Sequence, residues 1–214
     1  MICGGEEMGI RLIPDLECGA DPDVRSISCR PDDGRGRTQG SESYRAHAPR
    51  AYPYGIYDLS WNGGFVNVGT DRDSGAFAVA SIRGWWHFEG RRLYPKAERL
   101  LITADGGGSN GYRLRLWKLE LQKWADAAKL SLRFATFRRE QANGTRGAAT
   151  RLRDYETSVR LISATKTSKG LTVSCRLDRR KYPTGRKVTK EEMATFRIVP
   201  RTFRGEWNYV IRPR

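Results

Sequence analysis

Strand-like and helix-like patterns of apolar residues follow one another along the chain from about residue 51. Two β-prone runs, YGIYDL at 54–59 and GFVNVGT at 64–70, flank the sequence SWNG, whose Asn-Gly pair is typical of a hairpin turn. A third run, RLLITA at 99–104, is short and largely apolar, as in a buried strand. We therefore expect an antiparallel hairpin and, after it, a buried strand.

Two longer segments carry an apolar stripe at helical spacing. In 74–86 the stripe is Ala78, Ile82 and Trp85, and Ser74 is suited to cap the first turn. The stripe in 111–129 consists of Leu114, Trp117, Leu121, Trp124 and Ala128. The tryptophans of both segments are therefore expected in a core rather than stacked on nucleic-acid bases.

The C-terminal third continues the mixed pattern. A helix is expected over 155–165, and strands are expected over 171–177 and 206–211. Thr189 and Glu192 form a capping-box pattern before a short helix. The alternation of strands and helices predicts an α/β domain.

Residues 1–50 show neither the strand nor the helix period. They are rich in Gly, Asp, Arg, Ser and Pro, a composition that offers little apolar surface to offset the entropy cost of ordering the chain. We therefore expect an irregular N-terminal segment over 1–50 and one folded domain over 51–214.

The chain is strongly basic, with 39 Lys and Arg residues against 24 acidic ones and a formal net charge of +15. This excess favours a polyanionic partner such as DNA or RNA, although Arg-rich codon usage alone would also produce it. The four cysteines are widely separated, so neither a zinc site nor a disulfide framework is expected. No segment has the length of a membrane span or the form of a signal peptide, which predicts a cytoplasmic protein.

Asp105 directly follows the apolar run at 99–104 and precedes three glycines. A carboxylate at a strand end beside glycines suits a divalent metal ion and its bound phosphates, but an ordinary Asp-Gly turn has the same sequence. Ser109 and Asn110 come next, before a predicted helix N-terminus, where free N–H groups favour a phosphate. The loop is not of the Walker type, because no Gly-Lys-Ser/Thr follows.

Two further groups of charged residues are candidates for the same chemistry. Asp71, with Asp73 beside it, ends the second hairpin strand and is either an additional metal ligand or a turn residue. Arg113, Arg115 and Lys118 make the helix after the glycines basic, which suits contact with a DNA backbone but equally suits a solvated helix face.

Several long segments together resemble the DDE transposases of the Rhodopirellula type: YPYGIYDL, GFVNVGTDRD, FAVASIRGWW, RLLITADGGGSNGYRLRLWKLELQKWAD, LISATKTSKGLTVSCRLD, YPTGRKVTKEEM and GEWNYVI. The resemblance covers about residues 51–130 and 155–214. It implies an insertion-sequence transposase with an RNase H-like α/β fold, that is, a mixed sheet flanked by helices. In such enzymes three carboxylates bind two Mg²⁺ or Mn²⁺ ions for DNA cleavage and strand transfer, and Asp105 matches the second of the three.

Two parts of the family pattern are missing. The first acid of the family stands in a segment resembling VSVDTKKKEL, which residues 1–50 do not contain. The third, a Glu, follows a segment resembling CHFPPGTSKWNKIEH, whereas this chain reads ATFRREQANGTR at 135–146. Codons for residues 134–146, read one base earlier, can spell CHFPPGTSKWNK, so we infer a frameshift that disrupts the domain around 131–153.

The inferred frameshift changes what this region means. Glu140 does not replace the lost acid, and the fold is expected to be incomplete. Four arginines of the region need not form a selected DNA surface, because an out-of-frame reading can generate them: Arg138, Arg139, Arg146 and Arg151.

Three functions follow from these patterns. The leading prediction is a degenerate transposase copy without cleavage activity, since one carboxylate does not hold two metal ions. The alternative is a non-catalytic basic DNA-binding protein derived from a transposase, and a third is a phosphate-binding enzyme built on the glycine loop. The expected partners are transposon-end and target DNA, with a homo-oligomer as a further expectation and no membrane.

Overall fold

The computed structural model describes residues 7–14, 51–104, 108–111, 113–136, 155–164, 170, 173–183 and 185–214. The strands are β1 (Glu7–Pro14), β2 (Tyr52–Asp58), β3 (Gly63–Gly69), β4 (Arg99–Ala104), β5 (Ser131–Thr136), β6 (Val173–Asp178), β7 (Ile198–Pro200) and β8 (Asn208–Ile211). The helices are α2 (Gly75–Trp85), η1 (Trp86–Gly90), α3 (Arg91–Leu93), η2 (Gly108–Asn110), α4 (Arg115–Ala128), α5 (Tyr155–Ala164) and α6 (Lys190–Ala194).

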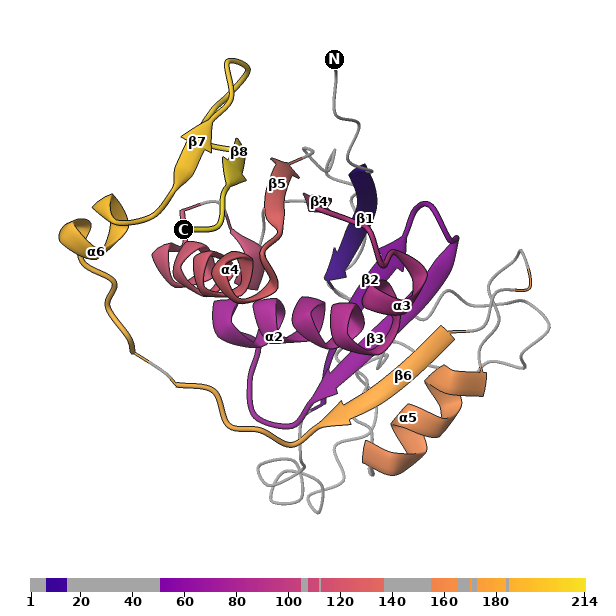
Figure 1. Ribbon diagram of the computed structural model, residues 1–214. Coiled ribbons are helices and arrows are strands. Elements are labelled where there is room, and N and C mark those ends of the chain that lie inside the picture. The colour runs from indigo at the N-terminus through magenta and orange to yellow at the C-terminus, as the bar shows by residue number, and fades with distance from the viewer. Residues whose placement is uncertain are drawn as a thin grey trace, which may run out of the picture.

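These strands form one mixed sheet in the order β6-β3-β2-β1-β4-β5-β8-β7 (Figure 1). β1, β4 and β5 are parallel to one another, and β3 is parallel to β6. β2 runs antiparallel to both β1 and β3, and β8 runs antiparallel to β5 and β7. Strands β1, β3, β4, β5, β6 and β7 therefore all end at the same edge of the sheet, which we call the carboxyl edge.

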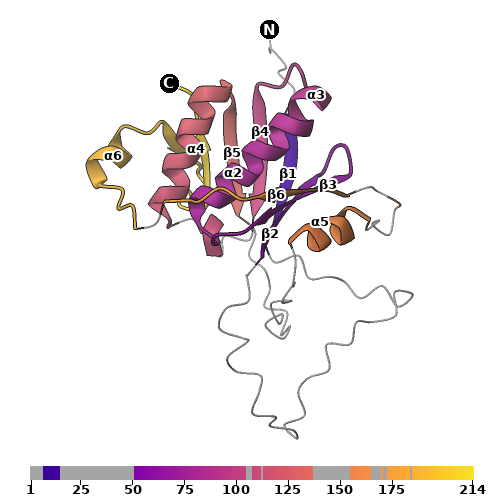
Figure 2. The ribbon, with the colours of Figure 1, turned by 90° about the horizontal axis from the view of Figure 1, so that it is seen from below.

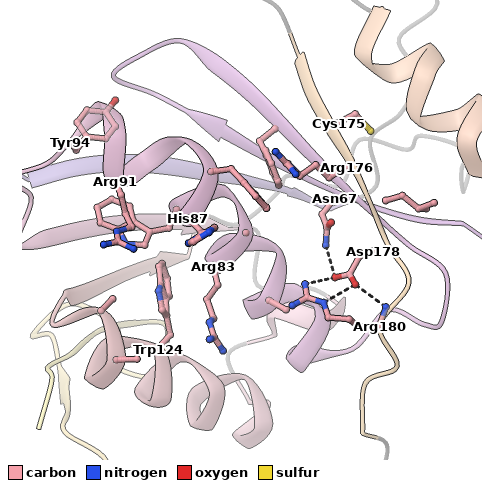
Figure 3. A pocket seen from close by; sticks show the side chains of 18 of the residues that line it. Asn67, Arg83, His87, Arg91, Tyr94, Trp124, Cys175, Arg176, Asp178 and Arg180 are labelled. Atoms are coloured by element: carbon pink, nitrogen blue, oxygen red, sulfur yellow. Dashed lines mark hydrogen bonds and ion pairs between the residues drawn. The ribbon is translucent and has the colours of Figure 1, made fainter.

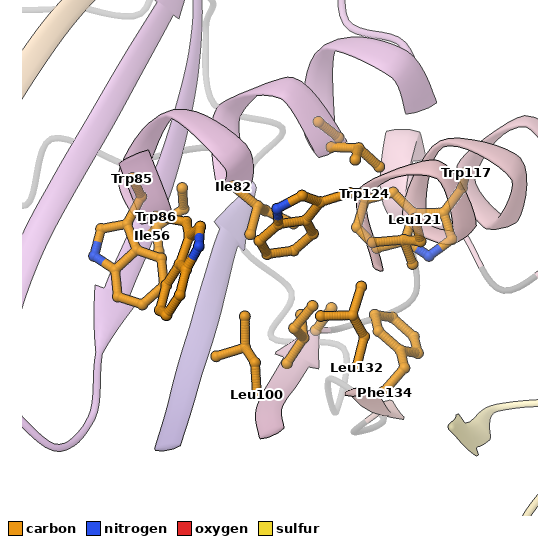
Figure 4. Packing of buried hydrophobic residues seen from close by; sticks show 14 of the residues in the cluster. Ile56, Ile82, Trp85, Trp86, Leu100, Trp117, Leu121, Trp124, Leu132 and Phe134 are labelled. Carbon is orange, nitrogen blue, oxygen red and sulfur yellow. The ribbon is translucent and has the colours of Figure 1, made fainter. Parts of the chain in front are cut away.

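Two helices cover one face of the sheet and make its hydrophobic core. From α2, Ile82 and Trp85 pack over β2 and β4, and from α4, Trp117, Leu121 and Trp124 pack over β5 (Figure 4). Each of these five side chains is at most 3% exposed. The stripe of α2 is therefore confirmed as core, and so are Trp117, Leu121 and Trp124 of the second stripe. Ala128 is only partly buried, and Leu114 is not a core residue, because it stands before the first turn of α4 and is 39% exposed.

The third long helix, α5, lies on the opposite side of β6 and β3 (Figure 2). Side chains of β6 alternate between the two faces. The Cys175 thiol lies near Ser163 of α5, whereas the Arg176 guanidinium lies 3.3 Å from the ring centre of Phe88 in η1. Helices thus flank the sheet on both sides.

A mixed sheet with helices on both faces confirms the expected α/β fold of the RNase H-like type. The predicted hairpin at 54–70, the strand at 99–104 and the two helices with apolar stripes are all present. Ser74 caps α2 as predicted, since its Oγ accepts a hydrogen bond from the Phe77 N–H at 3.2 Å. Thr189 and Glu192 form the predicted capping box.

Two segments differ from the expectation. Glu7–Pro14, within the segment expected to be irregular, forms β1 at the centre of the sheet, where it pairs with β2 and β4. Ser131–Thr136, the start of the region expected to be disrupted, forms β5. Residues 15–50 and 137–154 lie outside the described part of the chain. Within that part, no helix is long and apolar enough to cross a membrane.

Candidate active site at the carboxyl edge

The carboxyl edge collects the ends of six strands, with acids at or just after several of them. β4 ends at Ala104, and Asp105 is the next residue of the sequence, although it lies outside the described residues. Asp71 follows the end of β3, and Asp178 is the last residue of β6. Both are described, so their surroundings show whether they can act together with a group at the end of β4.

The turn that follows the glycines lies against the starts of two helices. A Cβ atom on Gly75, the first residue of α2, would lie 3.4 Å from the carbonyl oxygen of Ser109 and 3.2 Å from the Trp117 nitrogen in the first turn of α4. This close approach suits glycine at position 75. Helix N-termini carry partial positive charge, so the ends of α2 and α4 together make this part of the edge favourable for an anion.

The turn residues Ser109 and Asn110 are buried, with 6% and 0% of their surface exposed. Within the described residues, no partner is present for the Ser109 hydroxyl or for either amide atom of Asn110. Their burial does not favour the predicted direct contact of these side chains with DNA. Unpaired buried amides are rare in proteins, so this turn is a place where strain or an additional partner concentrates.

The three basic residues predicted to bind DNA have different surroundings. Arg115 donates a hydrogen bond from Nη1 to the Val188 carbonyl oxygen at 3.0 Å, which ties α4 to the segment before α6. The Lys118 ammonium lies 5.2 Å from the ring centre of Tyr209, and burial lowers the pKa of Lys118 while Glu206 opposes that shift. Arg113 is exposed ahead of α4. Arg113 therefore suits DNA contact best of the three, since Arg115 is engaged with Val188 and Lys118 is half-buried beside Tyr209.

Asp71 does not lie near the end of β4. Because β2 and β1 stand between β3 and β4, the two strand ends are three strand spacings apart, which is about 14 Å. Asp71 accepts a hydrogen bond from the backbone N–H of Tyr182 at 3.1 Å and lies 3.5 Å from Arg72. Its observed role is to hold the segment after β6 against the end of β3.

Asp178 forms a polar network that the sequence analysis missed. This buried carboxylate accepts hydrogen bonds from Asn67 at 3.3 Å and from the Arg180 backbone and guanidinium at 2.6 to 3.0 Å (Figure 3). It also accepts one from the Tyr182 hydroxyl at 2.5 Å. Although burial works in the opposite direction, the Arg180 and Tyr182 donors hold the pKa of Asp178 well below its usual range. The acid is saturated with donors and has no free lone pairs for a metal ion.

The same network borders a groove of about 1300 Å³ between α2, η1, the end of α4 and β6 (Figure 3). Its walls combine arginines with aromatic rings, among them Arg83, Arg91, Trp86 and Trp124. The sequence showed the tryptophans as core residues but did not show that basic side chains from separate elements border the same groove.

The described residues do not fit a two-metal site. Nowhere in the described ranges do three His, Cys, Asp or Glu residues gather as metal ligands would. On β1, the strand beside β4, the only acid is Glu7, which is in register with Arg99 at the start of β4. Ala104, the last residue of β4, comes five positions after Arg99, so Glu7 lies about 17 Å along the strands from the end of β4.

A family model matches the chain over residues 32–142 and 144–213, and it describes the Rhodopirellula transposase DDE domain. The match starts after β1 and is wider than the resemblance read from the motifs, because it also includes residues 32–50, 131–142 and 144–154. A search of curated proteins and of solved structures finds no match to this chain. Since the matched residues make up most of the chain, the chain belongs to the family of transposases with a Rhodopirellula-type DDE domain.

Proposed function

We propose that this chain is an insertion-sequence transposase copy that binds DNA but does not carry out two-metal DNA cleavage. Transposases of its family act on DNA and use divalent metal ions in general. The observation that carries the proposal is the placement of acids around the end of β4. Within its described residues, 7–14, the neighbouring β1 offers only Glu7, at the far end of the strand pair, and the residue after them, Asp15, lies outside the described part of the chain. Asp71 follows a strand three positions away in the sheet.

Retained DNA binding is supported by the charge around the same edge. The N-termini of α2 and α4 meet beside the turn at Gly108–Asn110, and Arg113 and Lys118 stand at the start of α4. Positive helix ends and basic side chains bind a phosphate backbone without needing a metal ion. Binding of this kind survives the loss of catalytic acids.

The cleavage claim is tested by incubating the full chain with transposon-end DNA and Mg²⁺ or Mn²⁺. We expect no strand cleavage above the background of a denatured sample. Metal-dependent cleavage that disappears in Asp105→Ala would overturn the proposal and would show that other residues complete the metal site. Asp71→Ala serves as the matched control, since an acid three strands away should leave any such cleavage unchanged.

A second candidate function is a non-catalytic DNA-binding protein that competes with intact transposase for transposon ends. It is favoured by the eight-stranded sheet and its buried core, which give the chain a folded scaffold that can bind DNA without a metal site. Salt-dependent binding that prefers transposon ends over unrelated DNA would support this function. Equal binding to both DNAs would argue against it.

The frameshift proposed for this copy has its own test in the nucleotide sequence across codons 130–155. Alternative-frame codons spelling the family's CHFPPGTSKWNK would support the frameshift as the cause of the lost third acid. Codons that cannot spell it would remove the frameshift, while the proposal on DNA binding would stand.

A further inference from the structure

The loop of the β7–β8 hairpin reaches the same edge of the sheet as the end of β4. Thr136, the last residue of β5, is in register with Ala104 and donates a hydrogen bond from Oγ1 to the Trp207 carbonyl oxygen at 2.9 Å. Residues 201–207, which we call the hairpin tip, therefore continue past the end of β4, two strand spacings or about 10 Å to the side. Figure 1 shows the tip protruding from the molecule.

The hairpin tip has a fixed conformation. The side-chain amide of Asn208 donates hydrogen bonds to the carbonyl oxygens of Phe203 at 3.1 Å and Arg204 at 3.4 Å, and the Asn208 backbone N–H also bonds to the Arg204 carbonyl. At Gly205 a Cβ would lie 2.8 Å from the Arg201 carbonyl oxygen, so the turn requires glycine there. These contacts hold the tip in place without help from the core.

The tip presents an aromatic ring to solvent. The side chain of Phe203 is 74% exposed, more than any other large hydrophobic residue in the described part of the chain. The Arg204 guanidinium carbon lies 5.6 Å from the Phe203 ring centre and 5.5 Å from that of Trp207. Exposed rings with arginine beside them are typical of surfaces on which nucleic-acid bases stack.

Charge at the tip favours an anionic partner. Arg201 and Arg204 are both exposed, and Glu206 is the one acid among residues 201–207. Glu206 interacts electrostatically with Lys118 on α4, which balances its charge. The arginines therefore give the tip its positive charge.

We propose that the hairpin tip is a DNA-contacting element in which Phe203 stacks on a base of a single-stranded or frayed DNA end, while Arg201 and Arg204 contact the neighbouring phosphates. Stacking requires an unpaired base, and double-stranded DNA offers one only where its end opens. The inference rests on the proposed function, which supplies DNA as the partner. It adds which element contacts the DNA and which form of DNA it selects.

The test compares the binding of the full chain to two probes, a blunt duplex and the same duplex with a short single-stranded 3′ extension carrying 2-aminopurine. Phe203→Ala should weaken binding to the extended duplex by about 5- to 20-fold and remove the quenching of 2-aminopurine, because one base–aromatic stack is lost. Binding to the blunt duplex should change by less than about twofold. Phe203→Trp keeps an aromatic ring and should keep both signals.

Trp61→Ala is the matched control. Trp61 is 65% exposed but lies in the β2–β3 turn, at the opposite edge of the sheet, so its loss should affect neither probe. In contrast, the double change Arg201→Gln with Arg204→Gln should weaken binding to both probes and reduce the salt slope by about 2.

The possible results distinguish a failure of the Phe203 stacking inference from a failure of the proposed DNA binding. If the unsubstituted chain binds DNA but Phe203→Ala shows the same affinities and the same quenching, the inference is wrong and the proposed function stands. If the unsubstituted chain binds neither probe, the proposed DNA binding itself fails. Equal thermal unfolding of all variants checks that they fold alike.

Discussion

Asp178 is a buried carboxylate that connects three parts of the fold. Its donors come from Asn67 on β3 and from Arg180 and Tyr182 after β6, and Asn67 also donates to Ser81 on α2 at 2.9 Å. An acid in a pocket of this kind resembles a catalytic group in its burial and shifted pKa. Its saturated hydrogen bonds, however, assign it to holding the edge strand β6 against α2.

Replacing Asp178 with Asn should destabilise the protein by about 2 to 3 kcal/mol at neutral pH, because the neutral amide accepts fewer hydrogen bonds from the buried donors. The folded pKa of Asp178 is depressed, so its contribution is present above the unfolded value of about 3.9 and is lost as pH falls toward the folded value. Thermal unfolding measured from neutral pH into the acid range should therefore show that the difference in stability between the unsubstituted protein and Asp178→Asn becomes smaller as the pH falls.

Glu98→Gln is the control for this pH dependence, because the Glu98 side chain is exposed before β4. Its effect on the free energy of unfolding should stay within about 0.5 kcal/mol. A gap between unsubstituted protein and Asp178→Asn that stays constant with pH would contradict the assignment of the depressed pKa.

At the scale of elements, two glycines near the end of α2 have opposite packing. At Gly84 a Cβ would lie 3.8 Å from Phe65, an ordinary contact, whereas at Gly90 it would lie 2.4 Å from the ring of the buried Trp86. Gly84→Ala should stabilise by about 0.5 to 1 kcal/mol through higher helix propensity, and Gly90→Ala should destabilise by about 1 to 3 kcal/mol through overpacking. Chemical denaturation of both variants measures the change in the free energy of unfolding. Changes of the same sign for Gly84→Ala and Gly90→Ala would contradict the packing around η1.

β1 makes a different prediction, because it stands at the centre of the sheet but outside the residues matched by the family model. A strand paired on both sides has its backbone amides in the ladder, and such amides exchange slowly. Hydrogen exchange followed by mass spectrometry should therefore show peptides covering 7–14 protected to a similar degree as those covering 99–104. Exchange of 7–14 at the rate of an unstructured peptide would rule out the central position of β1.

The elements that could be predicted from the sequence are those specified by local patterns. The stripes of α2 and α4 and the run at 99–104 recur at fixed spacings within one segment, so they were found. β1 is a single short apolar run among glycines and charged residues, and its state depends on pairing with β2 and β4, which lie far along the chain.

In the candidate site, too, local features could be predicted from the sequence, whereas long-range contacts could not. That β4 ends immediately before Asp105 could be predicted, since it is a local feature of the sequence. That Asp71 lies three strands from this point could not, because the distance depends on the order of strands in the sheet. The network of Asp178 with Asn67 joins residues 111 positions apart, and no pattern along the chain marks such a pair.

For the whole molecule, the central question is whether net charge or the position of charge determines DNA binding. The chain carries +15, but part of this charge comes from Arg138, Arg139, Arg146 and Arg151, which we ascribe to an out-of-frame reading. A diffuse excess of arginines would bind any polyanion. A built surface would instead depend on particular residues around the carboxyl edge.

Two variants with the same net charge distinguish these cases. One replaces the four arginines of the 138–151 region with Gln, and the other replaces Arg113, Lys118, Arg201 and Arg204 with Gln, so each lowers the net charge by four. If DNA binds at the carboxyl edge, the second variant should reduce the slope of log affinity against log salt by about 3 to 4, and the first should reduce it by less than about 1. Binding measured by fluorescence anisotropy over a range of salt concentrations gives both slopes. Equal salt slopes for the two variants would mean that net charge alone determines DNA binding. The carboxyl edge would then not be the DNA-binding surface.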